Sequence, residues 1–190
     1  MGSTLARLAD LHRLALERGR GFRRSRFLLE QLRAARGKAF TGVVGPRGVG
    51  KTVMLQQLAL GDERAFYLSA DTLDGEDLFE VAKRLSSDFS VEHLLIDEIH
   101  YAPDYAAVIK RLFDFLDLRV IFTSSVSLSL MDAAEDLSRR VQLRTLPPFS
   151  LREYLAFRHE QDLPSLTLED LWQRRWTREH LLAGAHFDGY

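Results

Sequence analysis

A glycine-rich segment at residues 45–52 carries the clearest chemistry in this sequence. It reads Gly45-Pro-Arg-Gly-Val-Gly-Lys51-Thr52, the spacing of a Walker A phosphate-binding loop. Glycines allow the backbone to curl until successive N–H groups point at one phosphate, and a helix that begins directly afterwards adds the positive end of its dipole. The pattern arises by chance in roughly 1% of chains of this length. We therefore expect a phosphate site here rather than a plain glycine turn.

The loop pattern also predicts a role for each side chain. Lys51 would reach the β- and γ-phosphates of a nucleotide, and the hydroxyl of Thr52 would bind Mg²⁺. The expected nucleotide-binding residues are Gly45, Pro46, Arg47, Gly48, Val49, Gly50, Lys51, Thr52 and Val53.

A second candidate element is the apolar run at 93–96, which ends in Asp97 and Glu98. A buried strand would place both carboxylates at the carboxyl end of a sheet, where ligands bind in open α/β folds. Asp97 is expected to hold Mg²⁺, and Glu98 to orient and deprotonate a water molecule. This Walker B-like pair favours hydrolysis, since a kinase does not need a water-activating glutamate. We interpret the nearby His100 as a packed or solvated histidine, with a hydrogen bond to Glu98 as the less favoured alternative.

Two further elements have a structural and a catalytic interpretation. The strand predicted at 119–123 leads into two serines, of which Ser125, or else Ser124, could sense the γ-phosphate or the water. Capping of the following helix is an equally good interpretation of these serines. Arg139 and Arg140 precede the strand at 141–143, and either could reach a γ-phosphate in its own or a neighbouring subunit. The alternative is a surface pair that faces the acidic middle of the chain.

The surrounding periodicity predicts an α/β domain. Helices are expected at 4–18, 23–35, 51–60, 75–86, 104–116 and 168–183, and strands at 39–44, 65–68, 93–96, 119–123 and 141–143. Alternation of strands and helices is typical of a parallel sheet covered on both faces, a three-layer arrangement. We expect an N-terminal helical segment at 1–36, a nucleotide-binding core at 37–160 and a C-terminal helical segment at 161–190, which we interpret as the start of a further domain. Residues 20–27 are the expected adenine pocket.

Composition excludes several classes of protein. The chain has 190 residues, 46% hydrophobic and 28% charged, which is typical of globular proteins. With no cysteine it has no disulfide, thiol nucleophile or Fe–S ligand, and its six histidines show no metal-ligand spacing. It has no apolar run long enough for a membrane span and no secretory signal pattern, so we expect a cytoplasmic protein.

The net charge of −1 conceals an uneven distribution. Residues 1–38 carry ten Lys and Arg against three Asp and Glu, whereas residues 62–136 carry six against 17. The basic N-terminal segment makes nucleic-acid binding a hypothesis, but a solvated helical face is the favoured interpretation because few aromatic residues accompany the arginines.

Taken together, these motifs resemble the additional-strand P-loop ATPases of the AAA+ and STAND kind, and most closely a prokaryotic family of AAA-type ATP-binding proteins. The resemblance covers residues 20–160 or so and rests on segments 45–52, 94–100, 122–125 and 148–155, the last of which reads Pro-Phe-Ser-Leu-Arg-Glu-Tyr-Leu. It implies the sheet order 5-1-4-3-2 and ATP rather than GTP. The chain also lacks an Asn-Lys-x-Asp segment for guanine.

Two functions follow as expectations. The first is an ATPase that hydrolyses ATP with Mg²⁺ and couples its nucleotide state to a partner, as a homo-oligomer or with another protein. The second is a nucleotide-dependent binding switch for protein or nucleic acid with negligible turnover.

Overall fold

The computed structural model describes residues 2–125, 137 and 139–189. They form two compact units, Met1–Leu146 and Pro147–Tyr190. Among the described residues, no helix is long and apolar enough to cross a bilayer.

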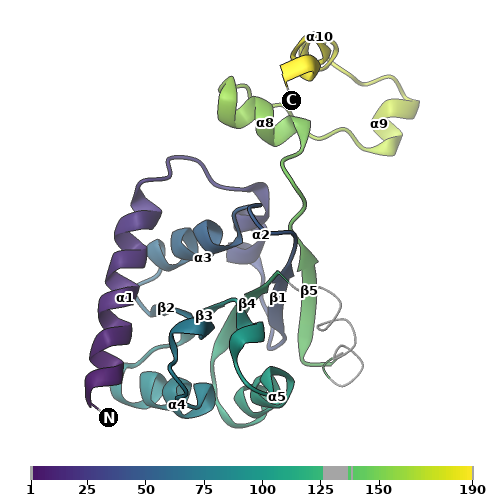
Figure 1. Ribbon diagram of the computed structural model, residues 1–190. Coiled ribbons are helices and arrows are strands. Elements are labelled where there is room, and N and C mark those ends of the chain that lie inside the picture. The colour runs from purple at the N-terminus through teal and green to yellow at the C-terminus, as the bar shows by residue number, and fades with distance from the viewer. Residues whose placement is uncertain (1, 126–136, 138, 190) are drawn as a thin grey trace. The chain divides into compact units, whose positions relative to one another are not determined.

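The first unit is built on a parallel sheet of five strands in the order β2-β3-β4-β1-β5 (Figure 1). The strands are β1 Phe40–Val44, β2 Ala65–Ser69, β3 His93–Asp97, β4 Arg119–Ser124 and β5 Val141–Thr145. This confirms the predicted order 5-1-4-3-2. The central strands are almost wholly buried, as expected for a parallel sheet covered on both faces.

Helices cover both faces of this sheet. They are α1 Gly2–Arg20, α2 Phe27–Ala34, α3 Lys51–Leu60, α4 Leu78–Phe89 and α5 Tyr105–Phe115. Short 3₁₀ turns follow β2 at Ala70–Thr72 and β3 at Ile99–Tyr101. The predicted helix at 23–35 begins only at Phe27, because Arg26 is extended and precedes the first turn.

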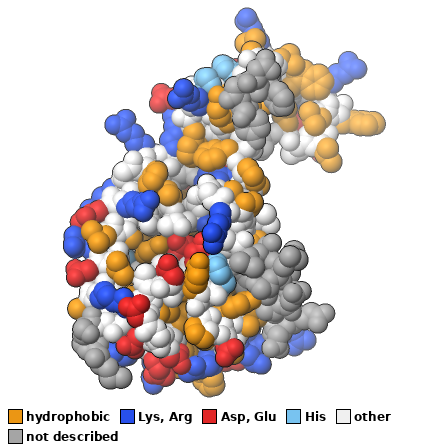
Figure 2. All heavy atoms as spheres, in the orientation of Figure 1, with side chains coloured by type: hydrophobic (Ala, Val, Ile, Leu, Met, Phe, Trp, Pro, Cys, Tyr) orange, Lys and Arg blue, Asp and Glu red, His pale blue; other side chains and the backbone are white. Residues whose placement is uncertain are grey.

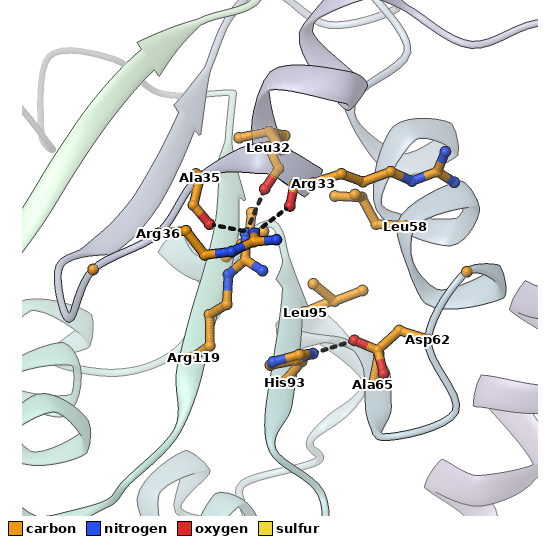
Figure 3. A pocket seen from close by; sticks show the side chains of 13 residues that line it. Leu32, Arg33, Ala35, Arg36, Leu58, Asp62, Ala65, His93, Leu95 and Arg119 are labelled. Carbon is orange, nitrogen blue, oxygen red and sulfur yellow. Dashed lines mark hydrogen bonds and ion pairs between the residues drawn. The ribbon is translucent and has the colours of Figure 1, made fainter.

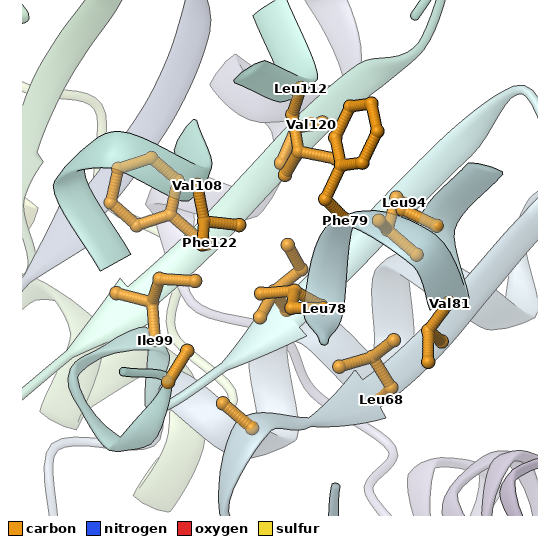
Figure 4. Packing of buried hydrophobic residues seen from close by; sticks show 14 of the residues in the cluster. Leu68, Leu78, Phe79, Val81, Leu94, Ile99, Val108, Leu112, Val120 and Phe122 are labelled. Carbon is orange, nitrogen blue, oxygen red and sulfur yellow. The ribbon is translucent and has the colours of Figure 1, made fainter. Parts of the chain in front are cut away.

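Alternation along the strands divides the core into two layers. Leu94 and Ile96 pack with α4 and α5, whereas Leu95 between them packs with α2 and α3. Figure 4 shows the first layer, in which Phe79 and Leu112 from the two helices lie over Leu94 and its neighbours on the sheet. The predicted three-layer α/β fold is therefore confirmed.

Acidic side chains are among those that gather at the end of the first unit where Figure 1 shows α4 and α5 (Figure 2). Some of their negative charge is neutralised locally. Arg111 of α5 pairs with Asp77, at 3.1 Å, and with Glu80, at 3.9 Å.

The second unit consists of short helices: α8 Leu151–Arg158, α9 Leu168–Trp172, α10 Arg178–Leu182 and the 3₁₀ segment Ala183–Gly189. Ser150 and Glu153 form a capping box at the start of α8. The single helix predicted at 168–183 is wrong. The chain reverses at Arg174, whose φ is +55°, and Thr177 starts a new helix.

Helix α1 is attached to the edge strand β2 through His12. Its Nδ1 accepts a hydrogen bond from the backbone N–H of Tyr67 on β2, at 3.0 Å, and its ring stacks on Phe66. Burial lowers the pKa of His12 below its ordinary value of 6.5. The fold therefore requires the neutral imidazole, since protonation would bury a charge and remove the acceptor.

We expect a pH-dependent contribution of His12 to stability. The contribution is fully present above pH 6.5 and is lost as the pH falls through the lowered pKa, because the unfolded chain takes up the proton first. Urea unfolding at pH 8, 7, 6 and 5 should show a fall in unfolding free energy that is shallower in His12→Gln. The control is exposed His159→Gln, which should retain the wild-type slope; equal slopes in all three proteins would contradict the assignment.

Candidate active site

The predicted site elements meet at the carboxyl edge of the sheet. Strand β4 lies between β3 and β1, with Ile96 opposite Phe122 and Val44 opposite Ser124. The ends of these three strands therefore bring the glycine loop, the acidic pair and the serines to one place.

The glycines of the loop occupy positions that other residues would disturb. Gly48 and Gly50 have φ values of +82° and +93°, in the left-handed region that favours glycine. A Cβ on Gly45 would lie 2.2 Å from the carbonyl oxygen of Leu146. Helix α3 begins directly after Gly50, at Lys51, so its first N–H groups lie beside the loop.

The other loop residues differ in exposure. Pro46, Arg47 and Gly48 are exposed, Val49 is buried, and Thr52 and Val53 are half-buried on the first turn of α3.

The ammonium group of Lys51 is held inside the loop. The residue is only 5% exposed, and its Nζ donates hydrogen bonds to the carbonyl oxygens of Gly45, at 2.8 Å, and Pro46, at 2.9 Å. Burial lowers the pKa of Lys51, and the nearby Glu98 and Asp97 carboxylates oppose this effect. The amine, the loop and both acids thus share one electrostatic environment.

A buried arginine, Arg26, fastens the loop to the N-terminal segment. Its guanidinium group donates a hydrogen bond to the carbonyl oxygen of Val49. Nearby, Gln57 of α3 donates hydrogen bonds to the carbonyls of Phe22, at 3.1 Å, and Arg24, at 2.9 Å. The segment proposed for adenine recognition is therefore tied to both the loop and α3, a role that sequence reasoning did not assign to Arg26.

Asp97 is buried and oriented by two hydroxyl groups. Thr123 of β4 donates to its Oδ1, and Tyr67 of β2 donates to its Oδ2 at 3.1 Å. Burial and the neighbouring carboxylate raise the pKa of Tyr67, which keeps its hydroxyl protonated as a donor. Sequence reasoning missed both partners, because each is more than 20 residues from Asp97 and no local motif marks it.

Glu98 lies in a strained turn immediately after β3, with a φ of +49°. Its backbone N–H donates to the hydroxyl of Thr123, at 3.0 Å. Its carboxylate accepts hydrogen bonds from Ser125, at 2.8 Å from the hydroxyl and 3.3 Å from the N–H. His100 Nδ1 lies 3.3 Å from Glu98 Oε2 and 3.2 Å from the Ser124 hydroxyl. The position of His100 thus agrees better with the less favoured interpretation, in which this histidine interacts with Glu98.

The donors at this edge are suited to magnesium. Asp97 and Thr52 supply hard oxygen atoms, and Mg²⁺ typically binds through one or two such side chains together with phosphates and water. In the described part of the chain, no three His, Cys, Asp or Glu residues form a metal cluster. The residues present therefore fit a nucleotide-bound Mg²⁺ rather than an all-protein metal site.

The two candidate arginines lie at the opposite edge of the sheet. The carbonyl of Arg140 accepts a hydrogen bond from Phe40 N–H at the start of β1, a strand length of about 13 Å from the glycine loop. Arg140 forms a bidentate ion pair with Asp114, with both nitrogen–oxygen distances at 3.0 Å. Arg139 is exposed and has no ion pair with any described residue.

We expect Thr123→Val to destabilise the fold by about 1–3 kcal/mol, because Asp97 Oδ1 and Glu98 N–H would each lose a buried partner. The matched control is Thr41→Val, since the Thr41 hydroxyl in β1 bonds to no described residue. Chemical unfolding should show a change of about 0.5 kcal/mol or less in the control. Equal losses of unfolding free energy in the two variants would contradict the role assigned to the Thr123 hydroxyl.

The chain is similar to known proteins over part of its length. An uncharacterized protein of Methanocaldococcus jannaschii, MJ1637, is 33% identical over 136 residues, which are 64% of this chain and 28% of that protein. The chain thus spans little more than a quarter of this relative's length. The Saccharomyces cerevisiae Hsp104-ADP complex has 23% identity and a TM-score of 0.53 over 68% of this chain and 22% of its own. Caenorhabditis elegans PCH-2 has 16% identity and a TM-score of 0.45, with coverage of 77% and 44%.

A family model described as an AAA domain matches residues 38–155, from just before β1 into α8. The match includes the glycine loop, the acidic pair and every strand of the parallel sheet. It covers more than half of the chain, and the shared fold with Hsp104 agrees with it. The chain therefore belongs to the AAA domain family of P-loop ATPases.

Proposed function

We propose that this chain binds ATP with Mg²⁺ and hydrolyses the bond between its β- and γ-phosphates, with the nucleotide state coupled to a partner. The observation that carries the proposal is that the Thr123 hydroxyl forms hydrogen bonds with both Asp97 and Glu98. Both carboxylates also interact electrostatically with the Lys51 amine. A phosphate loop beside two oriented carboxylates is suited to phosphoryl transfer to water.

In this proposal each residue of the edge has a distinct role. The backbone N–H groups of residues 45–53 other than Pro46, together with the Lys51 amine, bind the phosphates, and Thr52 and Asp97 hold Mg²⁺. Bound Mg²⁺ would neutralise charge on the β- and γ-phosphate oxygens. Glu98 orients water and takes up its proton. Ser125 holds the Glu98 carboxylate and connects it to the end of β4.

We further propose that Arg139 acts on the nucleotide of a neighbouring copy of this chain. The distance of about 13 Å along β1 favours action in trans over action on the chain's own loop. Arg139 is the better candidate of the two, because Arg140 is already paired with Asp114. This assignment requires a homo-oligomer.

The first test is Glu98→Gln, which keeps the shape of the side chain and removes the base. We expect phosphate release to fall by about 10²–10⁴-fold while ATP affinity stays close to wild type. Exposed Glu92→Gln, whose native side chain pairs with Arg64, is the matched control and should keep its activity. Phosphate release and calorimetric ATP binding are the measurements, and wild-type turnover in Glu98→Gln would refute the role of this residue.

A switch with negligible turnover is the second candidate function. It is favoured by the contacts of Glu98, whose carboxylate is already engaged by Ser125 and His100. For this function the wild type would bind ATP tightly, show no phosphate release above that of Glu98→Gln, and associate with its partner only in one nucleotide state. The same two measurements therefore separate a switch from a hydrolase.

The trans role of Arg139 predicts complementation between variants. We expect Arg139→Ala to lower phosphate release by about 10³-fold or more without loss of ATP binding, and Arg140→Ala to lower it less. Mixing Arg139→Ala with Lys51→Ala should restore activity, because an intact loop then faces an intact arginine. Failure of the mixture to recover, in a sample shown to form mixed oligomers, would exclude action in trans.

A further inference from the structure

A separate pocket lies at the amino edge of the sheet. It has a volume of about 520 Å³ and is lined by the ends of α2 and α3 and the first residues of β2, β3 and β4 (Figure 3). The glycine loop and Asp97 lie at the carboxyl ends of the strands. The pocket is therefore distinct from the candidate active site.

Two arginines converge on the same end of α2 beside this pocket. Arg119 at the start of β4 donates to the carbonyl oxygen of Leu32, and Arg36 donates to those of Arg33, at 2.7 Å, and Ala35, at 3.1 Å (Figure 3). Neither guanidinium group pairs with a carboxylate among the described residues. Burial and the like charge of Arg36 lower the pKa of Arg119. Neither group is ion-paired with a described carboxylate, although the Asp62 carboxylate partly offsets these effects on the pKa of Arg119.

The other charged groups of the pocket are already engaged. Asp62 is paired with His93, and Arg33 with Glu30 at 2.9 Å. Burial opposes the ionised form of Asp62, but hydrogen bonds from His93 and from the backbone of Arg64 outweigh this and lower its pKa. The carbonyl end of α2 contributes only about half a negative charge. Two guanidinium charges exceed this half charge and the charge of the Asp62 carboxylate together, so the pocket has a positive surplus.

The remaining wall of the pocket is apolar. Leu58 of α3, Leu95 of β3 and Ile121 of β4 contribute to it, and Figure 3 shows Leu58 and Leu95 beside the charged groups. A volume of this size is typical of small-molecule sites. A ligand that fits both parts has a compact anionic group at one end and an apolar body at the other.

We propose that this pocket binds an organic phosphate monoester, with the phosphate on Arg36 and Arg119 and the apolar body against Leu58, Leu95 and Ile121. A monoester carries a charge of about −1.5 to −2 at neutral pH, which matches two guanidinium groups. Each guanidinium has five N–H donors in a planar fork, of which only one nitrogen is used here, so donors remain for phosphate oxygens. The site goes beyond ATP hydrolysis and does not depend on it.

The test is calorimetric titration with 1-naphthyl phosphate, compared with inorganic phosphate and 1-naphthol. We expect one site per chain, with the ester bound at least about tenfold more tightly than either fragment. Exposed Arg36→Glu should weaken binding by at least about tenfold, and the milder Arg36→Gln should weaken it less. Partly exposed Arg84→Glu on α4 is the matched charge control and should bind as wild type. Circular dichroism and thermal melting establish that each variant is folded.

A loop variant separates this site from the nucleotide site. Lys51→Ala should leave naphthyl phosphate binding unchanged while it removes ATP binding, so failure of the ATPase proposal and failure of the pocket proposal give different results. Binding that is lost in Lys51→Ala, or that is unaffected by Arg36→Glu, would overturn the pocket proposal. Equal affinity for inorganic phosphate and the ester would remove the role of the apolar wall and overturn it as well.

Discussion

The hydroxyl of Thr123 is the contact on which the geometry of the acidic pair depends. It donates to Asp97 and accepts from the backbone of Glu98, so one buried group orients the last residue of β3 and the residue that follows it. It can do so only because β4 lies directly beside β3. The strand order is therefore part of the chemistry of the site, and it also brings Ser125 to the Glu98 carboxylate.

The N-terminal segment completes the site from outside the sheet. Arg26 anchors the glycine loop, and His12 of α1 holds the edge strand that carries Tyr67. Tyr67 in turn donates to Asp97. A basic segment that composition alone associates with phosphate or nucleic acid thus has a structural role in the site. Its buried arginine donates a hydrogen bond to a backbone oxygen of the loop.

The parts of the site that were predictable from the sequence are those formed by short runs of neighbouring residues. The glycine loop and the apolar run before Asp97 each combine chemistry with the element that positions it. The partners at Thr123, Tyr67 and Arg26 are separated from their contacts by more than 20 residues, and no local spacing marks them. For the same reason the sequence could not distinguish Arg139 from Arg140, because only the folded chain brings Asp114 to Arg140.

The strands that build the acidic site also build the arginine pocket. Strand β3 begins at His93 and ends at Asp97, while β4 has Arg119 at its start and Thr123 near its end. A rigid strand alone transmits nothing between these edges, because coupling requires an element with two states that both ligands bind unequally. Two helices contact both regions. Helix α2 begins beside Arg26 at the loop and ends at the carbonyls that Arg36 and Arg119 hold, and α3 begins at Lys51 and lines the pocket with Leu58. A shift of either helix along its axis would alter its contacts at both sites, so a linkage between the two sites runs more readily through these helices than through the sheet.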